Sequence, residues 1–461
     1  MRKYDVAIVG AGPGGYVAAI RLGQLGKKVA LIEKDKIGGV CLNYGCIPTK
    51  AIIHVAHLFK KIKWLREIGL EISEPKLDFK RIQEWKEKIL ERLRKGINYL
   101  LNSYSVEIFK GTASFVDHNK LNIRETGEEI YSENIIIATG SLPSELPNIK
   151  IDGKYVVDST FALELKEIPK EILIIGGGAI GLEFGCAFQN LGSNVYVVEI
   201  MDQLLPGFDR EISEYLRRSM ERRGAKIFLS STVSEIKISN DKVKAIVNTK
   251  DGIKEIEVDK VLLSVGRKPN VEGLNIENVK VARNNKGFII TDEFQRTNIS
   301  NIYAIGDITG PPFLAHRASK QGIIAAEVIS GLKSAYDYRA VPSVYFTDPE
   351  IVSVGLNEGE IKDREILIGK FPFSALGRAL AYGTSEGFVK IIADKKTNVI
   401  LGMQAIGEGI SDLSGEIALA LEMGATLEDL SFVMHPHPTL TEAIMEAAEN
   451  ALKKAIHILN K

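Results

Sequence analysis

Two stretches of the chain share one pattern of apolar and polar positions. In each, a short and mostly apolar run (residues 4–9 and 171–175) leads into closely spaced glycines, and a helical period follows. A short apolar run bounded by glycine is typical of a strand that is buried on both faces, as in a parallel sheet. The pattern predicts two strand–turn–helix units of the doubly wound α/β type in one chain.

The turns of both units contain glycines spaced as Gly-x-Gly-x-x-Gly. They are Gly10, Gly12 and Gly15 in the first turn and Gly176, Gly178 and Gly181 in the second. In a dinucleotide site the first glycine makes the tight turn, the second lets the backbone approach the pyrophosphate, and the third packs helix on strand. A single turn of this kind is a weak signal, because it also occurs without a ligand.

A second predicted strand follows each helix and ends on an acid, Glu33 or Glu199. A carboxylate at this place can accept hydrogen bonds from a ribose diol. Two complete copies of strand, glycines, helix, strand and acid therefore predict two dinucleotide sites. At the second site Glu199 would repel a 2′-phosphate, and no Arg or Lys follows it before Arg210, which favours NAD over NADP.

Three further predicted strands end on residues that suit a nucleotide site. These residues are Thr139 and Gly140, Gly266 and Arg267, and Asp307. The first two strand ends resemble places where a chain crosses between nucleotide-binding units. Asp307 could bind a ribityl hydroxyl of a flavin or could cap a helix, and by itself it favours the cap.

Two other stretches have a helical period. Residues 78–102 are dense in Lys and Glu, which predicts one long surface helix. Residues 439–457 predict a terminal helix.

The composition is that of a soluble globular protein. The chain has 461 residues, which predicts two to four domains, with 26% charged and 45% hydrophobic residues. Its formal net charge of zero argues against a nucleic-acid or anionic-membrane surface. The first residues show no secretory signal, and no apolar run approaches the ~20 residues of a spanning helix. With three cysteines only, we expect a reducing, cytoplasmic compartment.

Two of the three cysteines, Cys41 and Cys46, lie five positions apart beside glycines. On a regular helix their rise alone would separate them by about 7.5 Å, more than a disulfide spans, so a bridge requires a distorted turn. Asn43 and Gly45 are residue types that tolerate one, and the helix dipole would favour a thiolate if Cys46 opens a helix. A zinc site lacks further ligands, since Cys186 is remote and reads as a buried apolar residue. Two unreacting thiols remain open as the alternative.

With these residues in place, the chain resembles the flavin-dependent pyridine nucleotide–disulfide oxidoreductases over nearly its whole length. The motifs are CLNYGCIPTK at residues 41–50, VPSVYFTDPE at 341–350, residues 403–425, and HPHPTLTE at 435–442. One departure is Val40, where relatives usually have Thr, which puts a hydroxyl contact to the flavin phosphates in doubt.

The resemblance implies two Rossmann-like dinucleotide-binding domains, one for FAD and one for NAD, plus an α+β C-terminal dimerisation domain. The implied order is an FAD-binding domain (1–146), an NAD-binding domain (147–266), an FAD-binding return segment (267–338) and an interface domain (339–461). It also implies a homodimer in which the partner subunit supplies the catalytic base.

The resemblance further implies a redox disulfide between Cys41 and Cys46. His437 would deprotonate a dithiol substrate, with Glu442 as its orienting carboxylate, although a histidine between prolines is by itself more often a rigid loop residue. Lys50 would lie near the flavin and pair with Glu183; without the resemblance a surface ion pair of little value is the better interpretation. The implied FAD contacts are Gly10, Gly12, Gly15, Glu33, Lys50, Ala113, Thr139, Gly140, Asp307 and Ala315, and the implied NAD contacts are Gly176, Gly178, Gly181, Glu199, Val233, Gly266 and Arg267. No metal site is expected.

The activity that the resemblance implies is the NAD-dependent oxidation of dihydrolipoamide on 2-oxoacid dehydrogenase or glycine cleavage complexes. A second hypothesis keeps the fold and reduces another disulfide, such as that of glutathione or coenzyme A. Glutathione reduction generally uses NADPH, which Glu199 disfavours. A third is a docking subunit or flavin-bound redox sensor without catalysis, which both cysteines, His437 and Glu442 disfavour.

Overall fold

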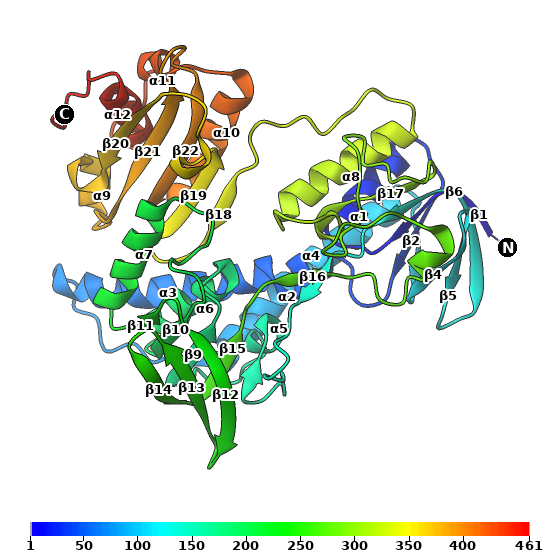
Figure 1. Ribbon diagram of the computed structural model, residues 1–461, viewed down its shortest axis with the longest axis horizontal. Helices are drawn as coiled ribbons and strands as arrows, with labels where there is room; N and C mark the ends of the chain where they lie inside the picture. Colours follow the sequence, from blue (N-terminus) through cyan, green and yellow to red (C-terminus); the bar gives the residue numbers. More distant parts are fainter. Residues whose placement is uncertain (1, 461) are drawn as a thin grey trace.

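The computed structural model describes residues 2–460, whose strands form five sheets arranged in three units (Figure 1). Two units contain parallel sheets of the Rossmann type, and the third is an antiparallel sheet covered by helices, so the predicted fold class is confirmed. The predicted long helix is confirmed as α4 (Phe79–Ser103), whose first turn is capped by the Asp78 carboxylate.

The first unit is built on a seven-stranded sheet. Parallel strands run in the order β3-β2-β1-β6-β17, and the hairpin β4-β5 extends the sheet from β6. The strands are β1 (Arg2–Val9), β2 (Val29–Glu33), β3 (Glu107–Lys110), β4 (Ala113–Asp117), β5 (Lys120–Ile123), β6 (Glu128–Ile137) and β17 (Ile302–Ala304). Since β17 joins strands from the first third of the chain, the chain returns to this unit after building the second. Helices α1 (Pro13–Gln24) and α8 (Ala315–Ile329) pack against each other here.

The second unit has a five-stranded parallel sheet in the order β11-β10-β9-β15-β8 and a three-stranded antiparallel sheet, β12-β13-β14. The strands are β8 (Val156–Val157), β9 (Glu171–Ile175), β10 (Asn194–Val198), β11 (Lys226–Phe228), β12 (Thr232–Ser239), β13 (Lys242–Thr249), β14 (Gly252–Val258) and β15 (Lys260–Leu263). Its helices are α5 (Ser159–Ala162), α6 (Ala179–Asn190) and α7 (Arg210–Arg222). The connections to and from the first unit pair as β7 (Ser141–Pro143) and β16 (Arg267–Pro269).

The third unit has an antiparallel sheet in the order β18-β19-β22-β21-β20. Its strands are β18 (Ser343–Tyr345), β19 (Glu350–Gly355), β20 (Ile366–Pro372), β21 (Gly387–Asp394) and β22 (Ile400–Gly407), and its helices are α9 (Gly377–Ala381), α10 (Ser414–Met423), α11 (Leu427–Phe432) and α12 (Glu442–Ala451). In Figure 1 this unit lies beside α7 of the second unit.

The prediction of a terminal helix over residues 439–457 is wrong at both ends. The helix α12 begins at Glu442 and ends at Ala451, and Lys453 has a left-handed backbone (φ 59°), which a continuing helix does not allow. No helix within residues 2–460 is long and apolar enough to cross a membrane.

Candidate active site

The two cysteines are joined by a disulfide where α2 (Gly39–Tyr44) meets α3 (Cys46–Glu67). Their Cα atoms are 4.6 Å apart because the helix breaks at Gly45, whose backbone (φ −145°, ψ −108°) is far from helical. The Asn43 amide donates to the carbonyl oxygens of Gly39 (2.9 Å) and Ile37 (3.1 Å) and holds the first turn in place. A distorted turn between the cysteines is confirmed at Gly45, whereas Asn43 lies within α2. Cys46 begins α3, which is the condition under which the helix dipole favours its thiolate.

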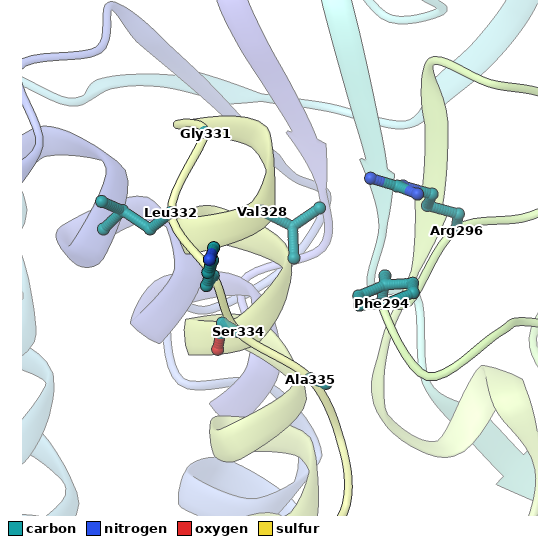
Figure 2. A pocket seen from close by; sticks show the side chains of 8 residues that line it. Phe294, Arg296, Val328, Gly331, Leu332, Ser334 and Ala335 are labelled. Carbon is teal, nitrogen blue, oxygen red and sulfur yellow. The ribbon is translucent and has the colours of Figure 1, made fainter.

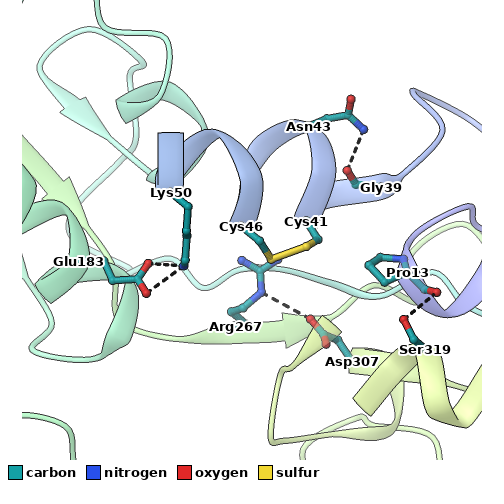
Figure 3. Close-up of a disulfide and its surroundings, with 10 residues drawn as sticks. All are labelled: Pro13, Gly39, Cys41, Asn43, Cys46, Lys50, Glu183, Arg267, Asp307 and Ser319. Atoms are coloured by element: carbon teal, nitrogen blue, oxygen red, sulfur yellow. Dashed lines mark hydrogen bonds and ion pairs between the residues drawn. A yellow bond between two sulfur atoms is a disulfide. The ribbon is translucent and has the colours of Figure 1, made fainter. Parts of the chain in front are cut away.

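One turn after Cys46, Lys50 lies on the same helix and reaches α6 (Figure 3). Its Nζ atom lies 2.9 and 2.7 Å from the two carboxylate oxygens of Glu183, whose side chain is only 8% exposed. The backbone amide of Phe346, from the third unit, donates to the same carboxylate at 2.9 Å. The alternative of a surface ion pair therefore does not hold, because the pair is sheltered and joins the three units.

The first glycine turn leaves space where a pyrophosphate would lie. A Cβ atom added to Gly10 would lie 2.4 Å from the Ala138 carbonyl oxygen, and one added to Gly15 would lie 1.9 Å from the Gly10 carbonyl oxygen, so both positions require glycine. By contrast, a Cβ on Gly12 would meet nothing within 4 Å. Gly12 is also the N-cap of α1, whose first turn carries no acidic side chain, so its amides and its dipole face open space.

The acid at the end of β2 braces this turn. Glu33 accepts hydrogen bonds from the amides of Ala11 (2.7 Å) and Asp35 (2.8 Å). These bonds fix the carboxylate beside the turn, where a ribose would follow the pyrophosphate.

The other residues expected to hold FAD are spread over the first unit. Thr139 has a buried hydroxyl for which no partner is found within residues 2–460, so this polar atom calls for a ligand partner. Asp307 lies in a short 3₁₀ helix whose N-cap is Ile305, so it is not a cap; it accepts a hydrogen bond from the Ser141 hydroxyl at 2.6 Å. Ala315 begins α8, whereas Ala113 begins β4 with its side chain in the apolar core.

The second glycine turn repeats the first. Added Cβ atoms on Gly176 and Gly181 would lie 2.4 and 2.3 Å from the backbone oxygens of Ser264 and Gly176, while one on Gly178 would meet nothing within 4 Å. Glu199, which is 5% exposed, accepts from the amides of Gly177 (2.6 Å) and Met201 (2.8 Å), as Glu33 does in the first turn. The turn and the acid therefore form a second cradle of the same design.

Three further residues expected at NAD are placed differently from one another. Gly266 has a left-handed backbone (φ 117°) in the connection before β16, and Val233 packs into the apolar core beneath β12. Arg267 donates to the Ser141 hydroxyl (2.6 Å) and carbonyl (2.8 Å) and lies 4.0 Å from Asp307. Its guanidinium therefore lies among residues expected at FAD, and burial lowers its pKa.

The histidine and glutamate of the last motif form a dyad in the third unit. His437 Nδ1 lies 2.9 Å from a Glu442 carboxylate oxygen, and the amide of Thr439 donates to the other oxygen at 2.8 Å. Burial acts to raise the pKa of Glu442, but these two hydrogen bonds outweigh it and the net pKa is lowered. The imidazole is 76% exposed, and α12, which begins five residues later, lies in the third unit, apart from α2 near the centre of the picture (Figure 1). The neighbouring His435 is instead a buried side chain that pairs with Glu416 at 2.9 Å.

A hollow of about 510 Å³ lies away from all of these residues, at the end of α8 (Figure 2). It is lined by Phe294, Arg296, Val328, Gly331, Leu332, Lys333, Ser334 and Ala335. None of the predicted catalytic or nucleotide-binding residues lines this hollow. We therefore place the candidate active site at the disulfide, the glycine turns and the His437–Glu442 dyad.

Comparison with known proteins agrees with this geometry. The model of the pyridine nucleotide-disulphide oxidoreductases matches residues 4–322, and the model of their dimerisation domain matches residues 341–448. The chain belongs to this family. Its cofactors are accordingly FAD and NAD.

Several members of the family match this chain from end to end. It is 43% identical to the dihydrolipoyl dehydrogenase of Geobacillus stearothermophilus, covering 99% of this chain and 98% of that one. It is also 43% identical to the dihydrolipoyl dehydrogenase of Thermus scotoductus over the full length of both. Among solved structures, LpdA of Mycobacterium tuberculosis superposes with a TM-score of 0.89 at 27% identity, covering 97% of this chain and 99% of that one. The flavoprotein disulfide reductase RclA of Escherichia coli superposes at 0.88 with 29% identity and the same coverage.

Sequence reasoning missed three residues that this family member uses to build the site. Ser141 bonds both Arg267 and Asp307, Phe346 supplies an amide to Glu183, and Asp348 pairs with Lys60. Ser141 directly follows Thr139 and Gly140, so its position was the only local signal. Phe346 and Asp348 lie in the motif at residues 341–350, but nothing in that motif indicates their partners in the other units.

Proposed function

We propose that the chain oxidises dihydrolipoamide with NAD and so produces NADH, as a dihydrolipoyl dehydrogenase. The observation that carries the proposal is the Cys41–Cys46 disulfide at the start of α3, in a chain that is 43% identical to curated dihydrolipoyl dehydrogenases. A disulfide in a broken helix at a helix N-terminus suits exchange with a dithiol, because the dipole favours the departing thiolate.

We assign FAD to the first cradle and NAD to the second. Gly12, Glu33, Thr139 and Asp307 would hold FAD, because they supply open amides, a carboxylate for a ribose, an unpartnered hydroxyl and a carboxylate for the ribityl chain. When bound, FAD would carry electrons from the reduced cysteines to NAD. The domain boundaries after residues 146, 266 and 338, which separate the FAD-binding, NAD-binding, return and interface segments, remain part of the proposal.

The second cradle would hold NAD through two features. The backbone amides of the turn around Gly178 would donate hydrogen bonds to the pyrophosphate, and the Glu199 carboxylate would accept hydrogen bonds from the ribose diol. The same carboxylate would repel a 2′-phosphate, which supports NAD rather than NADP. Gly266, Val233 and Arg267 remain predicted NAD contacts, with Arg267 the least well placed of the three.

The chain's own residues then perform the thiol chemistry. His437, as the neutral imidazole that Glu442 orients, takes a proton from one substrate thiol. The substrate thiolate attacks Cys41, the Cys41–Cys46 bond breaks, and Cys46 leaves as a thiolate. The second substrate thiol then displaces Cys41 and its proton passes to the departing Cys41 sulfur, so that the substrate leaves as a disulfide and the enzyme holds a Cys41 thiol and a Cys46 thiolate. Lys50, fixed by Glu183, provides a positive charge next to Cys46 on α3.

We further propose a homodimer in which His437 serves the disulfide of the partner subunit. The dimerisation domain and the separation of α12, which begins at Glu442, from α2 support this assembly. The third unit also carries exposed apolar side chains that a partner would cover: Leu419 (64%), Met423 (76%), Phe432 (93%) and Met434 (93%). Lipoyl-bearing subunits of 2-oxoacid dehydrogenase or glycine cleavage complexes would be the substrates, in the cytoplasm.

Anaerobic reduction of the purified holoenzyme tests this function. We expect dihydrolipoamide to produce a long-wavelength thiolate–flavin band that disappears as NAD is added and NADH forms. Cys41→Ser and Cys46→Ser should each abolish the reaction, while Cys186→Ala, a buried cysteine outside the site, should retain it. If NADH reduces the flavin but dihydrolipoamide does not, the proposed substrate is refuted and the assignment of FAD and NAD stands.

The main alternative is an enzyme that reduces another disulfide, for which the likeness to the disulfide reductase RclA is the specific observation. A panel of lipoamide, glutathione disulfide and coenzyme A disulfide with NADH and NADPH separates the two. Faster turnover of either of the last two would favour the alternative.

A further inference from the structure

The three units meet at the segment between β18 and β19, residues 346–349, which lies against both α3 and α6. At its start, the Phe346 amide joins the Lys50–Glu183 pair described above. Two residues later, Asp348 forms a second junction with the same two helices, and the function proposed above assigns it no role.

Asp348 is a buried carboxylate, 9% exposed, with donors from both helices. Lys60 of α3 places its Nζ atom 2.9 and 2.7 Å from the two carboxylate oxygens, and the Asn190 amide of α6 donates at 2.7 Å. Arg223, at the end of α7, donates to the backbone carbonyl of Asp348. A carboxylate that is satisfied from two helices links them directly, and a neutral side chain cannot accept from both with two oxygens.

The two junctions connect α3 and α6 at two positions along their axes. Lys50 and Lys60 are ten residues apart on α3, about 15 Å along the axis, and Glu183 and Asn190 are seven apart on α6, about 10 Å. The two helices also pack through apolar side chains, among them Ile53 of α3 and Phe184 of α6, and the second tie adds a polar restraint on their relative angle. Because Cys46 begins α3 and the Gly178 turn begins α6, this angle sets where the disulfide end of one unit faces the dinucleotide turn of the other.

We propose that Asp348 is a positioning residue that, through Lys60 and Asn190, holds α3 at the angle to α6 that electron transfer between the two nucleotide sites requires. It touches neither the disulfide nor the glycine turns and acts through the two helices alone. The proposal rests on the assignment of FAD and NAD above but not on the identity of the dithiol. A misplacement of about 1 Å between reacting groups costs about 100-fold in rate, so a small pivot is enough to matter.

Two variants break the junction from opposite sides. Asp348→Asn replaces one acceptor oxygen by a donor that faces Lys60 or Asn190, and Lys60→Met removes the α3 donor from a side chain that is already 43% exposed. The matched control is Asp209→Asn, which breaks another buried ion pair, that of Asp209 with Lys390, between the start of α7 and β21.

Three measurements on the holoenzymes decide the question. In anaerobic stopped flow we expect flavin reduction by saturating NADH to slow at least tenfold in both variants and less than twofold in the control. Reduction of the disulfide by dihydrolipoamide should stay within twofold. In hydrogen–deuterium exchange of the oxidised enzyme, the later turns of α3 should exchange faster in both variants but not in the control.

The outcomes separate positioning from general support of the fold. The proposal would be overturned if the reactions with NADH and with dihydrolipoamide slowed equally, if flavin reduction by NADH were unchanged, or if only Asp348→Asn had an effect. If Asp348→Asn does not fold, Lys60→Met alone decides the question. Reduction of the flavin by NADH needs no dithiol. A wild-type enzyme that does not react with dihydrolipoamide would therefore refute the proposed substrate but leave this test of Asp348 intact.

Discussion

The buried ion pair between Lys390 and Asp209 offers the sharpest stability test. Lys390 lies on β21 of the third unit and Asp209 caps α7 of the second, and both side chains are 3% exposed. Lys390 Nζ lies 2.6 Å from Asp209, with Glu211 and Glu358 more distant at 3.5 Å. Burial acts to lower the pKa of Lys390, but the hydrogen bond and charge of Asp209 raise it overall.

Breaking the pair from one side leaves a buried charge without its partner. Lys390→Met leaves the buried Asp209 carboxylate without its cation and should lower the free energy of unfolding by about 3–5 kcal/mol. Asp209→Asn leaves the Lys390 ammonium with Glu211 and Glu358 at 3.5 Å and should lower it by less, about 2–4 kcal/mol. The double variant strands neither charge. Asn is a good helix N-cap and Met fills the space of the lysine stem, so the double variant should lose about 1 kcal/mol.

The assay is urea unfolding of the four proteins as holoenzymes, compared as a double-mutant cycle on the first transition. The control is Lys370→Met, which removes a half-exposed lysine that pairs with Glu211 beside the same junction and should cost less than about 1 kcal/mol. A double variant that is as unstable as the sum of the two singles would refute the reasoning, because no stranded charge would then explain the loss.

Three further outcomes are expected. Gly12→Ala should leave the apoprotein folded and lower its affinity for FAD, whereas Gly15→Ala should disrupt the fold, since only the second Cβ meets backbone; far-ultraviolet circular dichroism and FAD titration distinguish them. Glu442→Gln should lower turnover of dihydrolipoamide about 10- to 100-fold by releasing His437, with flavin reduction by NADH unchanged in rate. Cationic neighbours outweigh the burial of Asp348 and lower its pKa to about 2, so its carboxylate should contribute about 2 kcal/mol to stability above about pH 4 and lose it as pH falls through about 2. The stability gap to Asp348→Asn in urea unfolding should therefore narrow by about 1 kcal/mol between pH 5 and pH 3, and a constant gap would contradict this assignment.

The local pattern of the sequence determined the parts of the site that depend on neighbouring residues. The two glycine turns with their acids, the broken helix at Gly45 and the helix after Asp78 follow from turn chemistry, hydrophobic period and capping within about 30 residues. The family resemblance added the pairs Lys50–Glu183 and His437–Glu442, which the structure places within hydrogen-bonding distance.

Only the tertiary structure decided which distant residues meet. Lys60 and Asp348 are 288 positions apart, and Arg267 and Ser141 are 126 apart, so no periodicity or turn signal connects them. The same holds for β17, which enters a sheet begun almost 300 residues earlier, and for the early end of α12, where the left-handed Lys453 stops a helix that the pattern continued. Patterns of this kind encode which face of an element is buried, whereas the partner that buries it is set by how distant segments of the chain pack into the apolar clusters.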